Sequence, residues 1–82
     1  MGKQYPPLDQ DQVETVLKAL NFSPKNTKGS HTQWEGHTKG KRRIVTVGHL
    51  GSRKEKYSHY LLRNMIQQSG LSKEEFYSYL GF

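Results

Sequence analysis

The tetrapeptide Lys28-Gly29-Ser30-His31 combines a side chain that can move protons with groups that can bind phosphate. A histidine titrates near neutrality, so His31 could act as a general acid or base when a phosphodiester is cleaved by its own 2′-hydroxyl. Such cleavage needs no metal and no cofactor, because the ribose supplies the nucleophile. Lys28 offers a charge and Gly29 a backbone N–H to a phosphate. An ordinary exposed histidine fits these residue types equally well.

Other catalytic or metal-binding arrangements of these residue types are less favoured. Because neighbouring strand residues point to opposite faces, we expect that His31 cannot activate Ser30 as a nucleophile. His37, His49 and His59 match no spacing typical of zinc sites, and the chain has no cysteine. We assign His49, which follows a predicted strand, at most a minor role near the nucleic acid.

Helical periodicity and capping residues frame a three-stranded meander. Asp9 with Gln12, and Ser72 with Glu75, have the spacing of capping boxes, and Gly70 is placed to end a helix. The predicted elements are a helix at 10–20, strands at 22–28, 30–35 and 42–47 with a hairpin loop at 36–41, a polar connection at 48–57, and helices at 58–69 and 73–80. This order predicts an α+β fold with helices on one face of an antiparallel sheet.

The chain has the length of one domain. Residues 1–7 are predicted to form an N-terminal arm, because Pro6-Pro7 is incompatible with a helix. Residues 8–82 then form the single domain.

Strand alternation predicts which side chains face the helices and which face solvent. Burial of Trp34 would place Ser30 and Thr32 on the same inner face, and burial of Phe22 would leave Thr27 outward. The inner side of the third strand is predicted to carry Val45 and Val47. The outer face would then carry Lys25, His31, Gln33 and Arg42. The helical layer is predicted to bury Tyr60, Leu61, Leu62, Met65, Ile66, Phe76 and Tyr79 in the core or at its edge.

The charge balance favours a polyanionic partner. The 82 residues include 13 Lys and Arg against 7 Asp and Glu, a formal net charge of +6. In so small a chain this excess attracts RNA or DNA, with an acidic protein as the second choice. No apolar run approaches the ~20 residues of a membrane span, and Met1 to Leu8 lacks the apolar region of a signal peptide. We therefore expect a cytoplasmic protein.

The densest basic run, Lys39-Gly40-Lys41-Arg42-Arg43, has two interpretations. It could bind phosphates of RNA independently of the base sequence, as a phosphate clamp, or it could be a solvated hairpin without a ligand. Composition leaves both open.

Several segments together carry a resemblance to one family. They are Val16-Leu17-Lys18-Ala19-Leu20-Asn21-Phe22, Lys28-Gly29-Ser30-His31, the β-branched third strand, and Gly70-Leu71-Ser72-Lys73-Glu74-Glu75-Phe76. In this order and spacing, the chain resembles the HicA toxins of toxin–antitoxin modules over roughly residues 8–80. It departs from many relatives at Tyr57-Ser58-His59, where they have a Pro-Gly-Thr-like turn.

The resemblance implies a double-stranded-RNA-binding-like fold and metal-independent cleavage of mRNA. His31 matches the family's catalytic histidine, and a HicB-type antitoxin would cover it. Our candidate RNA-binding residues are Lys25, Lys28, Gly29, Ser30 and Arg42. The rival hypothesis is a non-catalytic RNA-binding module on the same fold. A DNA-binding regulator is less favoured, because no predicted helix concentrates basic residues for the major groove.

Overall fold

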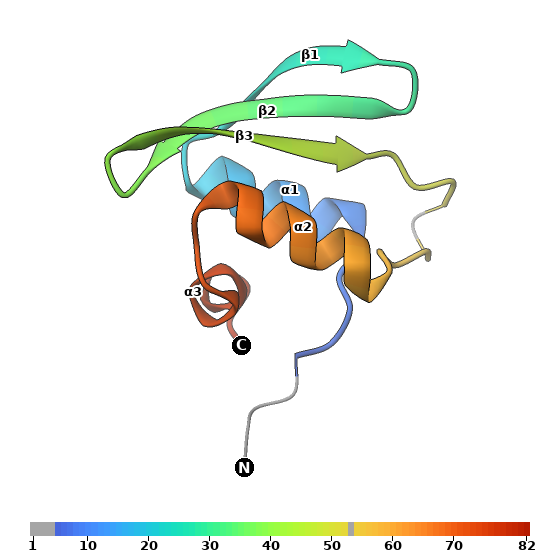
Figure 1. The fold of residues 1–82 in the computed structure, drawn as a ribbon. Coiled ribbons are helices and arrows are strands. Elements are labelled where there is room, and N and C mark those ends of the chain that lie inside the picture. The colour runs from blue at the N-terminus through green and yellow to red at the C-terminus, as the bar shows by residue number, and fades with distance from the viewer. Residues whose placement is uncertain (1–4, 53) are drawn as a thin grey trace.

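A three-stranded sheet forms one layer of the molecule, and helices cover one of its faces (Figure 1). The computed structural model describes residues 5–52 and 54–82. The elements are α1 (Gln10–Ala19), β1 (Ser23–Lys28), β2 (His31–Thr38), β3 (Lys41–Gly48), α2 (His59–Ser69) and α3 (Lys73–Ser78). The strands pair antiparallel in the order β1-β2-β3, which confirms the predicted α+β fold. Within the described residues, no helix has the length and apolar character needed to span a membrane.

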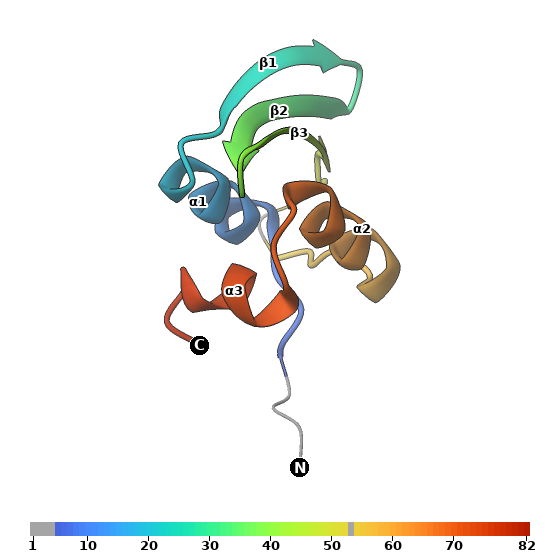
Figure 2. The same ribbon diagram turned by 60° about the vertical axis from the view of Figure 1, so that its left-hand side comes forward.

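Helices α1 and α2 lie under the sheet, and α3 lies beyond them on the side away from the strands (Figures 1 and 2). The core between the layers takes Val16 and Leu17 from α1, Trp34 and Val45 from the sheet, and Ile66 from α2. Among the residues that the structure describes, no helix covers the opposite face of the sheet, which is open to solvent (Figures 1 and 2).

The caps predicted from sequence are confirmed. Asp9 Oδ1 accepts from the Gln12 N–H at 2.8 Å, while Gln12 Oε1 accepts from the Asp9 N–H at 3.0 Å. Ser72 and Glu75 exchange the same pair of bonds at the start of α3. The C-cap of α2 is Gly70, whose φ of 81° is a left-handed conformation that glycine adopts without steric cost.

Three side chains assigned to the core are in fact exposed, and those assignments were wrong. Tyr60 and Leu61 are 70% and 50% exposed, because α2 meets the sheet through the face that includes Leu62 and Met65. Successive helical residues are rotated by about 100°, so Leu61 cannot share that face fully. Tyr79 is 47% exposed because α3 ends at Ser78, two residues before its predicted end.

The turn between β2 and β3 is shorter than predicted, whereas the turn between β1 and β2 is one residue longer. Lys39 and Gly40 have φ values of 52° and 78°, and positive φ at both positions is typical of a type I′ turn. The loop predicted at 36–41 was therefore wrong, since β2 continues to Thr38 and β3 starts at Lys41. The other turn is Gly29-Ser30, where only Gly29 has a positive φ, 57°.

Position 36 within β2 requires a glycine, because an aromatic ring occupies the space that a side chain would need. A Cβ built on Gly36 would lie 2.4 Å from Cδ1 of Phe22, and Phe22 is itself only 4% exposed. The ring of Phe22, which directly precedes β1, thus packs on the backbone of the central strand. A glycine that was assigned to a loop instead allows Phe22 to approach β2 closely.

Buried Tyr57 anchors the long connection between β3 and α2. Its backbone N–H donates to the Leu8 carbonyl at 2.9 Å, and its hydroxyl donates to the Gly48 carbonyl at 2.5 Å. Burial raises the pKa of Tyr57 to about 12, with smaller contributions from the carboxylates of Glu14 and Asp9. The last residue of β3 is therefore tied to the core through this phenol.

The described part of the N-terminal arm packs on α3. The rings of Tyr5 and Tyr77 have centroids 4.6 Å apart, and the Tyr77 hydroxyl donates to the Pro6 carbonyl at 2.5 Å. Burial raises the pKa of Tyr77. Residues 1–4 of the predicted arm lie outside the described residues.

We predict that Gly36→Ala lowers the free energy of unfolding by about 1–3 kcal/mol, because the methyl group would collide with Phe22. Urea unfolding measures this. Gly48→Ala is the matched control, since its Cβ would meet only ordinary contacts at 3.7 and 3.8 Å. Equal effects of the two substitutions would contradict the packing argument.

We predict that Tyr57→Phe costs about 0.5–1.5 kcal/mol at neutral pH, because the Gly48 carbonyl loses its donor. The raised pKa of Tyr57 means that the native phenol contributes stability below pH 10, which is lost as pH rises toward 12. The variant should therefore lose less stability than the native chain over this interval. Urea unfolding at several pH values measures both effects, with exposed Tyr60→Phe as control.

Candidate nucleic-acid interface

The alternation predicted for β2 is confirmed. Thr32 and Trp34 are buried against the helices, whereas His31 and Gln33 are exposed on the other face, and Glu35 is partly exposed. On β3, Val45 and Val47 are buried and Arg42 is exposed, also as predicted. The open face of the sheet therefore carries His31 together with Gln33 and Arg42. We call this surface the outer sheet face.

A bulge in β1 changes which of its residues reach this face. Pairing shifts between Pro24 and Asn26, so Lys25 is the extra residue. Beyond the bulge Thr27 pairs with Thr32, and their hydroxyl oxygens are 3.2 Å apart. The prediction that Thr27 points outward was therefore wrong, because the bulge reverses strand parity.

The same register places Lys28 directly opposite His31. Paired residues of antiparallel strands have Cα atoms only about 4.5–5.5 Å apart, so the two side chains rise from adjacent positions. Lys25 lies further along the outer sheet face, where its charge acts on the carboxylate of Glu35. Lys25 and Lys28 thus flank the face on the β1 side.

Ser30 lies in the turn before β2, not within the strand, so the predicted inward placement was wrong. Its hydroxyl oxygen is 3.5 Å from Nδ1 of His31, and both residues are exposed. The alternation argument that separated them does not hold in a turn. The separation itself is long for a hydrogen bond.

Gly48 faces His31 from the other neighbouring strand. A Cβ on Gly48 would lie 3.7 Å from Cδ2 and 3.8 Å from Nε2 of the His31 ring. The missing side chain leaves room for the imidazole to lie over the end of β3. Tyr57 holds the carbonyl of this same glycine.

Arg42 is not near His31, although both lie on the outer sheet face. It pairs with His37, six residues along β2, and at about 3.3 Å per residue the two positions are about 20 Å apart. Its Nε donates to Glu35, and this hydrogen bond is the main reason that the pKa of Glu35 is lowered. The charges of Arg42, Lys25 and His37 lower it further, against partial desolvation.

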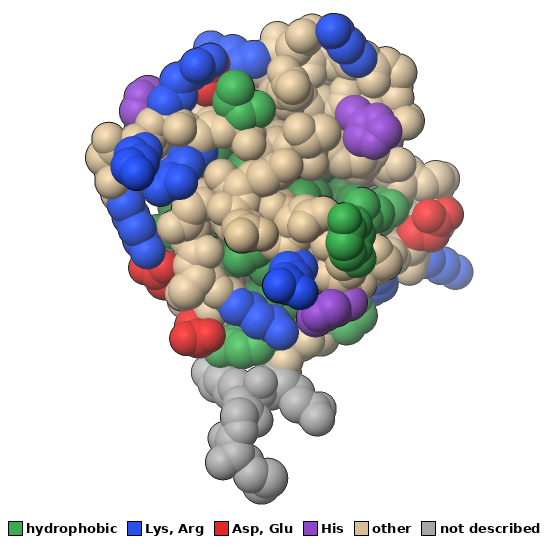
Figure 3. Space-filling view, viewed as in Figure 1, with side chains coloured by type: hydrophobic (Ala, Val, Ile, Leu, Met, Phe, Trp, Pro, Cys, Tyr) green, Lys and Arg blue, Asp and Glu red, His purple; other side chains and the backbone are tan. Residues whose placement is uncertain are grey.

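The residues of the basic run at 39–43 lie in different environments. The Lys39 ammonium pairs with Glu75 at 2.8 Å, which lowers the pKa of Glu75 to about 2 together with bonds from Ser72. Arg43 points to the helical side, where its Nε lies near Gly70. Figure 3 shows basic side chains gathered at the end of the sheet where β2 and β3 join. Lys39 and Arg42 are thus paired with carboxylates, and phosphate binding by the run stays a prediction.

The other histidines have different surroundings. His49 Nε2 is 2.7 Å from the Thr32 hydroxyl, and its backbone N–H donates to the Ser30 carbonyl at 2.7 Å. His37 is exposed on β2, and His59 begins α2. Among the described residues, no three His, Cys, Asp or Glu side chains come close enough to hold a metal ion.

The sequence predicted the position of His31 on the outer sheet face, but it did not predict the residues that surround the ring. Gly48 and Tyr57 were not assigned to the site, and His49 was given at most a minor role. Gly48, His49 and Tyr57 all lie outside the β1–β2 hairpin. The register between β2 and β3 is the feature that would have connected them with His31. A turn of two residues at 39–40 would have supplied that register.

Comparison with known proteins identifies the family. The family model described as "HicA toxin of bacterial toxin-antitoxin" matches residues 11–71, which include the outer sheet face and all of its candidate residues. No curated protein matches the chain. HicA toxins are ribonucleases that cleave mRNA, and a helix, an antiparallel sheet and C-terminal helices in a double-stranded-RNA-binding-like arrangement fit this family. The chain belongs to the HicA toxin family.

Proposed function

We propose that this chain cleaves mRNA at the β1–β2 end of the outer sheet face, with His31 as the general acid or base. The observation that carries the proposal is the exposed His31 imidazole directly opposite Lys28. Membership of a family of mRNA-cleaving ribonucleases supports the reaction class. His31 then carries out the proton transfer, and the neighbouring basic residues bind phosphates of the RNA.

The reaction that suits a single histidine is attack of a ribose 2′-hydroxyl on the adjacent phosphorus. The bond from the 2′-oxygen to phosphorus forms while the bond to the 5′-oxygen breaks, which leaves a cyclic phosphate and a 5′-hydroxyl. One proton leaves the 2′-oxygen and one reaches the 5′-oxygen, so the step requires no oxidant and no cofactor. His31 can accept the first or donate the second, because its ring is exposed beside the strand end.

Lys28 is the residue best placed to neutralise the reacting phosphate, because it rises beside His31. Backbone N–H groups of the Gly29-Ser30 turn would bind the same phosphate. Lys25 and Arg42 would contact other phosphates of a chain lying along the sheet, and Glu35 would have to release Arg42 for that contact. Such contacts position RNA and carry no sequence information.

The same arrangement explains how a protein can inhibit the toxin. HicA toxins are neutralised by HicB antitoxins. We propose that a HicB-type partner covers the strand end with His31 and Lys28. Both side chains are exposed on the outer sheet face, which no helix of the described residues covers, so a partner seated there excludes RNA by occupying its place.

His31→Ala should reduce cleavage of a long mRNA by about 10²–10⁴-fold, the usual contribution of a general acid or base. The purified chain is incubated with the RNA and EDTA, and fragments are resolved on a gel. His37→Ala is the matched control, because that exposed histidine lies at the far end of the same strand. The fold should survive both changes, and circular dichroism checks this.

Cleavage by His31→Ala at the native rate would overturn the assignment of His31. Intact RNA with the native chain, together with a salt-sensitive gel shift, would favour the non-catalytic RNA-binding module.

A further inference from the structure

We propose that His49 is a positioning residue that holds His31 and Lys28 in their reactive arrangement. This inference rests on the proposed function, since it assigns His49 a role in the same reaction. His49 acts through the residues on either side of His31 and does not itself touch the RNA. Its two hydrogen bonds and the strand register carry the argument.

His49 binds both chain neighbours of His31. Its backbone N–H donates to the Ser30 carbonyl at 2.7 Å, which extends the ladder one residue beyond the end of β3. Its Nε2 lies 2.7 Å from the hydroxyl oxygen of Thr32. Hydrogen bonds to His49 therefore hold both chain neighbours of His31, through the carbonyl of Ser30 before it and the side chain of Thr32 after it.

The contact continues across the sheet to β1. The Thr32 hydroxyl is also 3.2 Å from the Thr27 hydroxyl, so Thr27, Thr32 and His49 form a chain that links β1 and β2 to the residue that follows β3. Thr27 directly precedes Lys28 at the end of an edge strand whose residues are all exposed. The chain thus ties down the strand end that carries the proposed phosphate ligand.

The exposed ring of His49 contacts Thr32, whose side chain lies on the face opposite His31. Thr32 is 7% exposed and faces the helices, whereas His31 faces solvent on the outer sheet face. A contact with Thr32 on that face can set the position of the hairpin without competing for the substrate. A small displacement of a reacting group can cost about 10²-fold in rate, so such support affects catalysis strongly.

The test is steady-state cleavage of a short RNA by four variants. His49→Ala and Thr32→Val should lower kcat about 10–100-fold, with KM changed less than about twofold, because Lys25 and Lys28 still bind phosphate. His49→Gln should retain kcat within about threefold, because its amide can replace the bond from Nε2. Thr32→Ser should behave similarly, because it keeps the hydroxyl.

Native kcat in His49→Ala, or equal losses in His49→Gln and His49→Ala, would overturn the role of His49 while His31-dependent cleavage stands. Should His49→Ala fail to fold, Thr32→Val against Thr32→Ser decides the matter. A native chain that leaves RNA intact overturns the proposed function, and the role of His49 with it.

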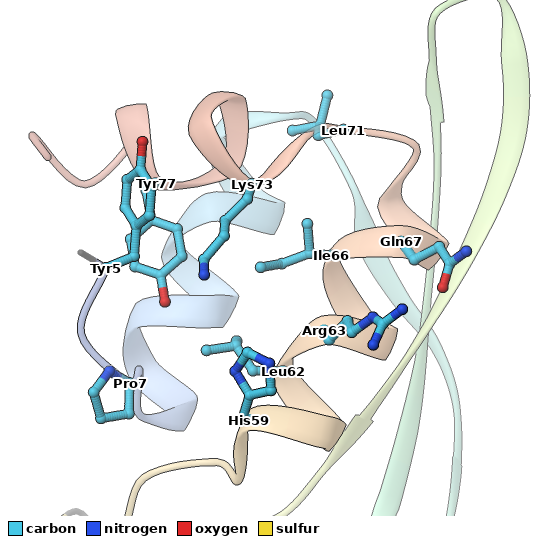
Figure 4. A pocket seen from close by; sticks show the side chains of 10 residues that line it. All are labelled: Tyr5, Pro7, His59, Leu62, Arg63, Ile66, Gln67, Leu71, Lys73 and Tyr77. Atoms are coloured by element: carbon cyan, nitrogen blue, oxygen red, sulfur yellow. The ribbon is translucent and has the colours of Figure 1, made fainter. Parts of the chain in front are cut away.

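A different observation carries a second inference, on the helical side of the molecule. A pocket of about 720 Å³ opens between the N-terminal arm, α2 and α3 (Figure 4). We infer that it docks a segment of a partner protein in which apolar side chains are flanked by carboxylates. The pocket lies away from the sheet, so this partner would leave the outer sheet face accessible to RNA.

The lining of the pocket determines this chemistry. Its apolar wall includes Leu62, Ile66 and Leu71, and three basic side chains border it: His59, Arg63 and Lys73. The described residues that line the pocket include no Asp or Glu. The Lys73 ammonium lies 5.3 Å from the centre of the Tyr5 ring, which keeps it at the pocket edge. Apolar surface bordered by positive charge complements apolar side chains beside carboxylates.

The test follows NMR chemical shifts of backbone amides in the isotopically labelled chain during titration with two blocked tetrapeptides. Both peptides have a leucine–phenylalanine centre, which is flanked by glutamates in one and by glutamines in the other. The glutamate peptide should shift amides of α2 and of residues 71–73 and bind at least threefold more tightly at low salt. Arg63→Gln with Lys73→Gln should remove the difference, whereas the exposed control Lys18→Gln should not. The proposed docking would be overturned if both peptides bound equally tightly, or if the shifted amides lay outside α2 and residues 71–73. Binding of free 4-phenylbutyrate without binding of the glutamate peptide would also overturn it.

Discussion

The antiparallel pairing of β2 with both neighbours is the constraint on which the rest of the structure depends. Alternate residues of this one strand serve the core and the outer sheet face, with Trp34 on one side and His31 on the other. A slip of one residue would expose Trp34 and bury His31. The packing of the indole under the sheet therefore also selects the register that presents the imidazole. Stability and the candidate site depend on the same set of backbone hydrogen bonds.

The parts of the fold that local rules govern were predictable from the sequence. Asp9 and Ser72 cap their helices through side chains three residues away, and Gly70 ends α2 through its own conformation. The inward position of Trp34 follows from its size and from strand alternation. These features depend on neighbours in the chain, so residue types and spacing contain the necessary information.

The errors arose where distant segments decide the outcome. The bulge at Lys25 reversed the direction of Thr27, and no residue type marks that bulge in advance. Gly36 was assigned to a loop because the reason for a glycine there, the ring of Phe22, is distant in sequence and packs on β2 only in the folded chain. The surroundings of His31 depend in the same way on the register of β3, which a two-residue turn determines. Residue types alone did not locate that turn.

The β1 edge of the sheet has a further consequence for how the protein behaves among other chains. An unpaired edge strand exposes backbone groups that can template strand addition and aggregation. Here Pro24 lacks an N–H, the bulge at Lys25 interrupts the ladder, and two lysines place like charge along the edge. A second copy brought alongside would meet missing donors and electrostatic repulsion. The lysines proposed to attract RNA therefore also protect the edge from self-association.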